Sequence, residues 1–373
     1  MDSKRSVIII GCGRVASKHI KAIKKLKDRC YLAALVDNNP DAPARLLASS
    51  GLKGDIKIYS DYKLAIEELH PDIVAVTVPS GLHYSIAEYA LEHGCHLLLE
   101  KPMTMSSSES RKIYELSLAK ERKIAMGHIF RYFPLVSLLQ QDIASGKFGK
   151  VTHGTIFVRW GHKDDYYQTA AWRGTWKSDG GALMNQTIHA IDLLVWLMGS
   201  TPIEAEAMLA QRLRSIEAED LGMAILRMND GALASIEGTT ATSDKEHAAM
   251  FTVFCENGVI NLGIRKGKPS LNIRNGSGKK LNGKYIRKQL KCYGLSSMLN
   301  ALNPHTGIYK DFLDALDDGR QPLADAASGY TSVDTLMGIY KSALLKKAVT
   351  LPLEDDFSSM DMQGFFENNK KSI

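Results

Sequence analysis

The sequence contains no long apolar run. Near its N-terminus only four apolar residues stand together, at positions 7–10. A signal peptide needs about 7 to 15 such residues and a membrane-spanning helix about 20. We therefore predict a cytoplasmic protein with no membrane partner.

Cysteine is scarce, and its spacing indicates neither metal binding nor redox chemistry. No CxxC pair occurs among the five scattered cysteines, which are Cys12, Cys30, Cys95, Cys255 and Cys292. Histidines and carboxylates also fall at no recognised ligand spacing. We expect reduced, mostly packed thiols and no bound metal.

One segment lacks acidic residues, and it accounts for the formal net charge of +6. Residues 265–291 hold ten Lys and Arg, and the rest of the chain has 37 basic against 41 acidic residues. Because the excess is local, it does not indicate a face that binds nucleic acid. We interpret residues 267–284, rich in Gly, Lys and Asn, as a mobile, solvated loop.

The first 130 residues alternate short apolar runs with amphipathic stretches, which is typical of a parallel sheet with crossover helices. Strands are predicted at 7–10, 31–36, 73–78, 96–99 and 124–126, and helices at 82–93 and 106–122. The fold class is therefore α/β, and residues 1–130 are predicted to form a doubly wound Rossmann domain.

The pattern changes after residue 150. A strand is predicted at 151–160, a helix at 181–198, a helical region at 309–347, and turns at Asn229-Asp230-Gly231 and Asn257-Gly258. We predict a second, α+β domain over 131–353 with a large, mostly antiparallel open sheet. The polar tail, 354–373, has too few apolar residues to pack firmly.

Residues 11–16, Gly-Cys-Gly-Arg-Val-Ala, match the dinucleotide-binding pattern G-x-G-x-x-G/A directly after the first strand. Gly11 permits a tight turn, Gly13 lets the backbone approach a pyrophosphate, and Ala16 allows close packing of helix on strand. Asp37 ends the second strand, where a carboxylate can bind the adenosine ribose, although a solvated turn residue is the alternative. A carboxylate repels a 2′-phosphate, so we predict NAD rather than NADP.

Three polar residues are candidates for chemistry. Lys101 follows the strand at 96–99, at the edge where parallel sheets bind ligands, and its ammonium group can stabilise a developing alkoxide. Asn185 and His189 lie four residues apart on one helix face, where His189 can act as general base. The alternatives are a solvated lysine and a buried histidine bonded to Asp192.

These residues resemble the Gfo/Idh/MocA oxidoreductases over about residues 5 to 353. The motifs that carry the resemblance are Gly11-x-Gly13, residues 77–83 (Thr-Val-Pro-Ser-Gly-Leu-His), Glu100-Lys101-Pro102 and Gly180-Gly181-x3-Asn185-x3-His189-x2-Asp192. Residues 172–176 (Trp-Arg-Gly-Thr-Trp) and Asn303-Pro304-His305 with Tyr309 are similar to the branch of UDP-N-acetylglucosamine uronate 3-dehydrogenases. Many family members have Asp at the position of Asn185, which shifts the acid–base role toward His189.

The resemblance implies NAD contacts at Gly11, Gly13, Arg14, Val15, Asp37, Ser80, His83, Glu100, Lys101, Trp172 and Arg173. It implies catalytic roles for Lys101, His189 and Asn185. The substrate-binding residues that we expect are Lys101, Arg159, His162, Asn185, His189, His305 and Tyr309, with Lys163 and Arg173 as further candidate cations for a carboxylate and a pyrophosphate.

The activity that follows is NAD-dependent oxidation of a sugar hydroxyl to a 3-keto sugar, in the biosynthesis of surface polysaccharides. Two other enzymatic readings are a keto-sugar reductase and a dehydrogenase of a free polyol such as an inositol. A non-catalytic dinucleotide sensor is the alternative from another class, although a sensor needs neither Lys101 nor His189. The family resemblance also implies a homo-oligomer, a dimer or tetramer, formed through the second domain's sheet.

Overall fold

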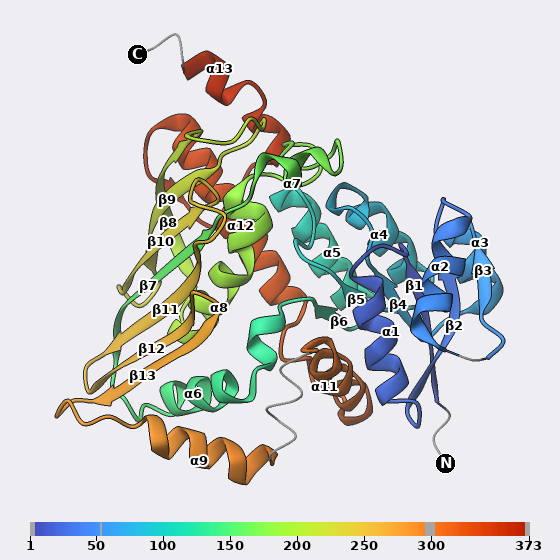
Figure 1. Ribbon diagram of the computed structural model, residues 1–373, viewed down its shortest axis with the longest axis horizontal. Coiled ribbons are helices and arrows are strands. Elements are labelled where there is room, and N and C mark those ends of the chain that lie inside the picture. The colour runs from blue at the N-terminus through green and yellow to red at the C-terminus, as the bar shows by residue number, and fades with distance from the viewer. Residues whose placement is uncertain (1–3, 53, 295–302, 370–373) are drawn as a thin grey trace. The chain divides into compact units, whose positions relative to one another are not determined.

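The computed structural model describes residues 4–52, 54–294 and 303–369, and the chain folds into two compact units (Figure 1). Of these residues, 4–104, 109–133 and 303–330 form the first unit, and the remainder form the second. The sequence predicted that the first domain ends at residue 130 and that residues 131–353 form the second. The chain instead returns to the first unit with helix α11 (His305–Asp318), a segment expected in the second domain.

The first unit is built on a sheet of six parallel strands in the order β3-β2-β1-β4-β5-β6. The strands are β1 (Arg5–Ile10), β2 (Cys30–Val36), β3 (Lys57–Tyr59), β4 (Ile73–Val76), β5 (His96–Leu99) and β6 (Ile124–Met126). This order reverses at β1, and the crevice at that point is where doubly wound folds bind dinucleotides. The Rossmann prediction is confirmed.

Helices cross between these strands because the apolar strand cores must be covered on both faces. All four residues of β4 are buried, as are the last four of β1. The helices and short 3-10 turns of this unit are α1 (Ala16–Lys25), α2 (Asp41–Ser50), α3 (Tyr62–Leu69), η1 (Ser80–Leu82), α4 (His83–Glu92), α5 (Ser107–Ala119), η2 (Ile129–Tyr132) and α11. The start of α5, residues 107 and 108, is counted with the second unit.

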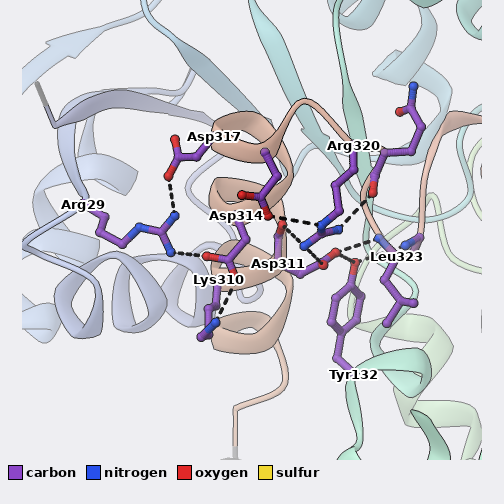
Figure 2. A network of polar contacts seen from close by, with 11 residues as sticks. Arg29, Tyr132, Lys310, Asp311, Asp314, Asp317, Arg320 and Leu323 are labelled. Atoms are coloured by element: carbon purple, nitrogen blue, oxygen red, sulfur yellow. Dashed lines mark hydrogen bonds and ion pairs between the residues drawn. The ribbon is translucent and has the colours of Figure 1, made fainter. Parts of the chain in front are cut away.

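Helix α11 joins the first unit through apolar and ionic contacts. Ile308 and Phe312 are fully buried in the core that contains α1. Figure 2 shows the polar side: the Arg29 guanidinium donates to Asp314 and Asp317 over 2.5 and 2.8 Å. The Asp311 carboxylate accepts from Arg320, Tyr132 and the Leu323 amide at 2.7, 3.3 and 2.7 Å. Apolar and acidic side chains thus alternate along α11. Both kinds of contact hold this distant segment in the first unit.

The second unit contains an eight-stranded sheet in the order β13-β12-β11-β7-β10-β9-β8-β14. Among the described strands of this sheet, only the β7–β10 pair is parallel, so the predicted mostly antiparallel sheet is confirmed. The strands are β7 (Val151–Trp160), β8 (Pro202–Ala210), β9 (Leu221–Met228), β10 (Leu233–Thr239), β11 (His247–Cys255), β12 (Gly258–Arg265), β13 (Lys268–Asn275) and β14 (Val349–Thr350).

One face of this sheet is covered by helices, chiefly α8 (Ile188–Met198) and α12 (Ala326–Leu345) (Figure 1). Gly154 on β7 lies against Leu194 and Met198 of α8. The remaining helical elements of the unit are α6 (Pro134–Ala144), α7 (Asp164–Gln168), the π-helix η3 (Ala182–Thr187), α9 (Asn282–Tyr293), η4 (Ser359–Met362) and α13 (Phe365–Asn369). No helix among the described residues is long and apolar enough to cross a membrane.

Two expectations about this unit were wrong. The predicted mobile loop at 267–284 is instead β13 followed by the start of α9, because Ile273 and Tyr285 are buried and fix the segment. The polar tail also packs, since Phe357, Met362 and Phe365 are all less than 9 % exposed. Three well-spaced apolar side chains suffice for packing where the average composition is polar.

The predicted helical region at 309–347 is two helices: α11 belongs to the first unit, and α12 is counted with the second unit from residue 331 onward. Gly319, with φ +74°, ends the first of them. A left-handed glycine after the last helical turn is a common helix terminator. The helix predicted over 181–198 is confirmed, and its first turns have π geometry.

Candidate cofactor and catalytic sites

The glycine loop after β1 has the geometry that a dinucleotide site requires. Gly11 has φ +94°, and a Cβ there would lie 2.8 Å from the carbonyl carbon and oxygen of Thr77. A side chain at Gly13 would meet nothing within 4 Å. Helix α1 begins at Ala16, and no side chain caps its N-terminus. Gly11 thus serves the turn, and Gly13 leaves open space at a helix N-terminus, which fits a phosphate group.

Asp37 lies beside the same loop. Its Oδ2 accepts a hydrogen bond from the Cys12 amide at 2.7 Å, and its Oδ1 accepts from the Asn39 amide at 2.9 Å. Burial and then the Asp37 charge raise the pKa of Cys12 to about 12, so the thiol stays protonated. The half-buried carboxylate at the carboxyl end of β2 therefore fits the ribose position expected from the sequence.

His83 is not placed as a cofactor contact, contrary to our expectation. Its side chain is 1 % exposed. The two ring nitrogens lie 2.7 Å from the Pro102 carbonyl oxygen and 3.1 Å from the Val78 carbonyl oxygen. Burial lowers the pKa of His83. A buried ring between two carbonyls braces the loop after β4 against the loop after β5. Ser80, by contrast, is half-buried at the start of η1 and stays available.

Glu100 also serves the protein interior rather than a cofactor. Its Oε1 accepts from the Nε2 atoms of His19 and His305, each at 3.0 Å. Burial works against the charge of Glu100, but the two histidine hydrogen bonds outweigh it and hold its pKa well below the ordinary value. A buried carboxylate with two donors ties the end of β5 to helices α1 and α11.

The sequence placed His305 and Tyr309 at the substrate, and the structure contradicts this. Both side chains are buried in the first unit, 2 % and 0 % exposed. His305 bonds to Glu100, and the Tyr309 hydroxyl lies 3.2 Å from Nδ1 of His19. The motif at 303–309 is therefore a structural anchor for the buried carboxylate.

One described cluster has the composition of a metal site. Ligand atoms of His19, Glu100 and His305 all lie within 4.8 Å of one another and are buried. The same atoms are joined by the two hydrogen bonds to Glu100, and the Tyr309 contact on His19 continues the network. Because these bonds use the candidate ligand atoms, the geometry is that of a hydrogen-bonded carboxylate.

Lys101 is half-buried and stands between two fixed neighbours. Glu100 before it is held by His19 and His305, and the carbonyl of Pro102 after it lies on His83. The lysine thus projects from a rigid loop at the carboxyl end of β5. Such preorganisation is what an alkoxide-stabilising cation requires.

Asn185 and His189 lie in the second unit, on the continuous π and α segment η3–α8. Both are half-buried. The Asn185 Nδ2 donates to Asp179 Oδ1 at 2.6 Å, and Asp179 Oδ2 accepts from the Gly174 amide at 3.1 Å. A π turn is frequent at functional sites. Asp192, offered as the alternative partner of His189, is 2 % exposed and accepts from Ser332.

Sequence reasoning missed Asp179. This buried carboxylate fixes which end of the Asn185 amide faces away from it, because only the NH₂ group can donate to it. Its signal in the sequence was its place directly before Gly180-Gly181, six residues ahead of Asn185.

Two of the expected substrate cations are already paired. Arg159 donates to both carboxylate oxygens of Glu237, at 2.6 and 2.7 Å, across the neighbouring strands β7 and β10. Lys163 lies 3.4 Å from Asp244. The bidentate pair neutralises the charge of Arg159 and uses two of its five N–H donors, which makes Arg159 a poor candidate for a substrate phosphate.

His162 was expected as a further candidate cation, and its surroundings disfavour a charge on the ring. Burial, with His247 and Arg173 nearby, lowers the pKa of His162 to about 4, so the ring is neutral at pH 7. It stacks on Tyr166 with a ring separation of 3.9 Å and contacts Gln186 at 3.1 Å. His162 can therefore offer a hydrogen bond but no charge.

Arg173 is the best placed of the proposed cations in this unit. Its guanidinium lies over the rings of Tyr166 and Trp172, 4.4 and 4.5 Å from their centres, and donates to the Tyr166 hydroxyl at 2.7 Å. It forms no ion pair with a carboxylate among the residues that the structure describes. Arginine stacked on aromatic rings keeps its charge available for an anion.

Comparisons with known protein families match both parts of this chain. Residues 5–128 match the oxidoreductase family with an NAD-binding Rossmann fold, and residues 136–261 match the GFO/IDH/MocA C-terminal domain. The WlbA dehydrogenase from Bordetella pertussis, solved with NADH and UDP-GlcNAcA, is 29 % identical, with a TM-score of 0.84 over 95 % of this chain and 99 % of that one.

Two enzymes related in sequence have other substrates in their names. The UDP-N-acetylglucosamine 3-dehydrogenase of Acidithiobacillus ferrooxidans is 22 % identical, over 67 % of this chain and 71 % of its own. The inositol 2-dehydrogenase of Corynebacterium glutamicum is 24 % identical, over 72 % and 76 %. With both domains matched, this chain belongs to the Gfo/Idh/MocA family and is an NAD-dependent oxidoreductase.

Proposed function

We propose that this protein oxidises the C3 hydroxyl of a UDP-N-acetylhexosamine uronate to a ketone, with NAD as the oxidant. The observation that carries the proposal is the similarity over 95 % of the chain to a dehydrogenase solved with NADH and UDP-GlcNAcA. We place the reaction in the cytoplasm, in the biosynthesis of surface polysaccharides.

NAD, when bound, accepts the hydride that leaves the sugar carbon. We propose that Gly11, Gly13, Arg14, Val15, Asp37 and Ser80 hold it, with Trp172 and Arg173. The open space at Gly13 and the fixed carboxylate of Asp37 support the first part of this set. The buried side chains of His83 and Glu100 act one step away, by bracing the loops that carry Ser80 and Lys101.

The chain's own residues move the proton and stabilise the charge. His189 takes the proton from the substrate hydroxyl as general base. The ammonium group of Lys101 stabilises the oxygen as negative charge develops on it. Asn185, whose amide is oriented by Asp179, binds a neighbouring sugar hydroxyl and keeps the ring in place.

An anionic substrate needs a cation, and Arg173 is the residue that we assign to this task. The guanidinium has aromatic and hydroxyl partners but no described carboxylate partner. The neutral ring of His162 adds a hydrogen bond to the same region of the second unit, since it stacks on Tyr166 beside Arg173.

We also propose that the protein is a homo-oligomer, a dimer or tetramer, formed through the open face of the eight-stranded sheet. Apolar side chains on β8, β9 and β10 stand exposed there, including Met208 at 82 % and Ile225 at 57 %. Alternate residues of β9 are buried on the covered face. An exposed apolar stripe of this kind is typical of a subunit interface.

Oxidation of a free polyol is the second candidate, and the relationship to an inositol 2-dehydrogenase favours it. NADH formation at 340 nm, measured with UDP-uronates, UDP-hexoses and free polyols, separates the two. Added 2-oxoglutarate detects cofactor that is retained and reoxidised. Turnover of a UDP-uronate supports the proposal. Turnover of a polyol alone would sink the nucleotide-sugar assignment, and tight NAD binding without turnover would favour a sensor.

A further inference from the structure

A buried carboxyl group lies at the start of the helical segment that carries Asn185 and His189. Glu219 is 0 % exposed and lies two residues before the start of β9. Its Oε1 accepts from the Leu183 amide at 2.8 Å and from the Tyr340 hydroxyl at 3.0 Å. Its main-chain carbonyl accepts from the Ala182 amide at 2.9 Å.

These contacts replace a local helix cap. The first amide groups of a helix have no partner within it, and a side chain at the N-cap normally supplies one. Gly181, at that position, has no side chain to do so. Burial and Glu219 raise the pKa of the Tyr340 hydroxyl. The main-chain groups of Gly181 and Met184 oppose this rise. Glu219 therefore accepts from the first two amides of the segment, those of Ala182 and Leu183, and Tyr340 anchors its carboxyl group.

Gly181 owes its identity to this contact. A Cβ at Gly181 would collide with the main-chain oxygen and the Oε2 atom of Glu219. Only glycine lets the two approach so closely. The second glycine of the motif at 180–181 is thus explained by a carboxyl group 38 residues later in the sequence.

The carboxyl group is poised between two protonation states. Oε2 of Glu219 is buried and has no hydrogen-bond partner among the described residues. Burial, and then the neighbouring Asp220, raise the pKa of Glu219 to about 7. The Asp220 carboxylate accepts hydrogen bonds from three main-chain amides, those of Arg212, Leu213 and Arg214. The Tyr340 hydroxyl is the other titratable group that faces Glu219.

We propose that Glu219 is a positioning residue, whose ionised carboxylate holds the first turn of η3–α8 and so fixes Asn185 and His189 for the proposed reaction. Hydrogen bonds to a charged acceptor are about twice as strong as neutral ones, and a helix N-terminus favours a negative charge. Protonation keeps the contacts and weakens them. The inference rests on the proposed function only for the kinetic part of its test.

Glu219→Gln imitates the protonated state, because the amide keeps one acceptor oxygen and carries no charge. We expect the ratio of kcat of the wild type to kcat of this variant to be about five-fold at pH 8 and to approach one at pH 6. The ratio cancels any pH dependence that the two proteins share, so it reports the contribution of Glu219. The KM for NAD should not change. A ratio that is the same at both pH values overturns the proposal.

Hydrogen exchange of the peptide 182–190 tests the same idea without turnover. After correction for intrinsic rates, the wild type should exchange faster at pH 6 than at pH 8, and Glu219→Gln should show no such difference. Tyr340→Phe should raise exchange at both. Ser342→Ala is the matched control, a buried hydroxyl on the same helix that bonds to Lys347 and Ala207 instead. Equal exchange of the wild type at both pH values contradicts the inference. If the wild type shows the expected hydrogen exchange but has no dehydrogenase activity, only the proposed function is contradicted.

Discussion

Two glycine-to-alanine substitutions in the glycine loop should affect different properties of the protein, its stability in one case and its cofactor binding in the other. Gly11→Ala forces a Cβ onto a backbone with φ +94° and brings it within 2.8 Å of the Thr77 carbonyl. Gly13→Ala places the same methyl group where nothing lies within 4 Å. The first change should damage the fold, and the second should damage only cofactor binding.

The magnitude for Gly11→Ala follows from two costs. A left-handed backbone costs an ordinary residue about 1 to 2 kcal/mol. Displacing the Thr77 backbone by a few tenths of an ångström adds about 1 to 3 kcal/mol, as overpacking does. For a unit of this size, the total lowers Tm by about 5 to 15 °C. Gly13→Ala should leave Tm within about 2 °C, since surface changes rarely exceed 0.5 kcal/mol.

The assay combines thermal unfolding of both variants without cofactor with titration of NADH fluorescence. Gly13→Ala should weaken NADH binding by at least about ten-fold, because the methyl group occupies space that the pyrophosphate needs. If Gly13→Ala binds NADH as the wild type does, or Gly11→Ala unfolds at the wild-type temperature, the assignment of the loop is refuted.

Three further predictions address other parts of the molecule. His305→Ala removes one of two donors from the buried Glu100 carboxylate and should lower the free energy of unfolding by about 3 kcal/mol, measured in urea; wild-type stability would count against that role. Because the pKa of Glu100 is lowered, its contribution is present above its unfolded pKa and lost as pH falls through its folded pKa, so the stability difference between the wild type and Glu100→Gln should shrink in acid. Ile225→Glu should dissociate the oligomer in sedimentation without lowering Tm by more than about 2 °C, whereas an unchanged mass would exclude this face as the interface.

Much of the first unit could be predicted from the sequence, because its signals are local. Buried parallel strands appear as continuous apolar runs, and the strands at 96–99 and 124–126 were predicted exactly. The glycine loop also carries its own signature, since the turn and the close approach both require glycine. These features depend on residues that are close together in the sequence, so a single sequence is enough to predict them.

The errors arose where distant residues decide the structure. Nothing near His305 in the sequence indicates that its ring donates to Glu100. Arg159 resembled a free cation until its neighbouring strand supplied Glu237. Likewise, nothing near Glu219 in the sequence indicates that its carboxyl group accepts from the Leu183 amide at the start of η3. Residues that are distant in the sequence but adjacent in the fold change the exposure and the charge of a side chain. Composition alone does not reveal which residues these are.

The composition of a segment also misled where a few side chains outweigh the average. Residues 267–284 are polar and glycine-rich, yet Ile273 alone gives β13 a buried side chain and a fixed register against β12. In the tail, Met362 is 0 % exposed, and the Ser359 hydroxyl donates to the Trp176 carbonyl at 2.6 Å. A single buried residue can order a segment that its other residues would leave solvated.

Transfer of the C3 hydrogen to the cofactor is the central claim, and isotopic labelling tests it most directly. UDP-N-acetylglucosamine uronate carrying deuterium at C3 would be incubated with the purified protein and NAD, and the reduced cofactor analysed by mass spectrometry. The account predicts NADH that carries one deuterium, and loss of this product in both Lys101→Met and His189→Asn. Reduced cofactor without deuterium, or undiminished labelling in both variants, would contradict it.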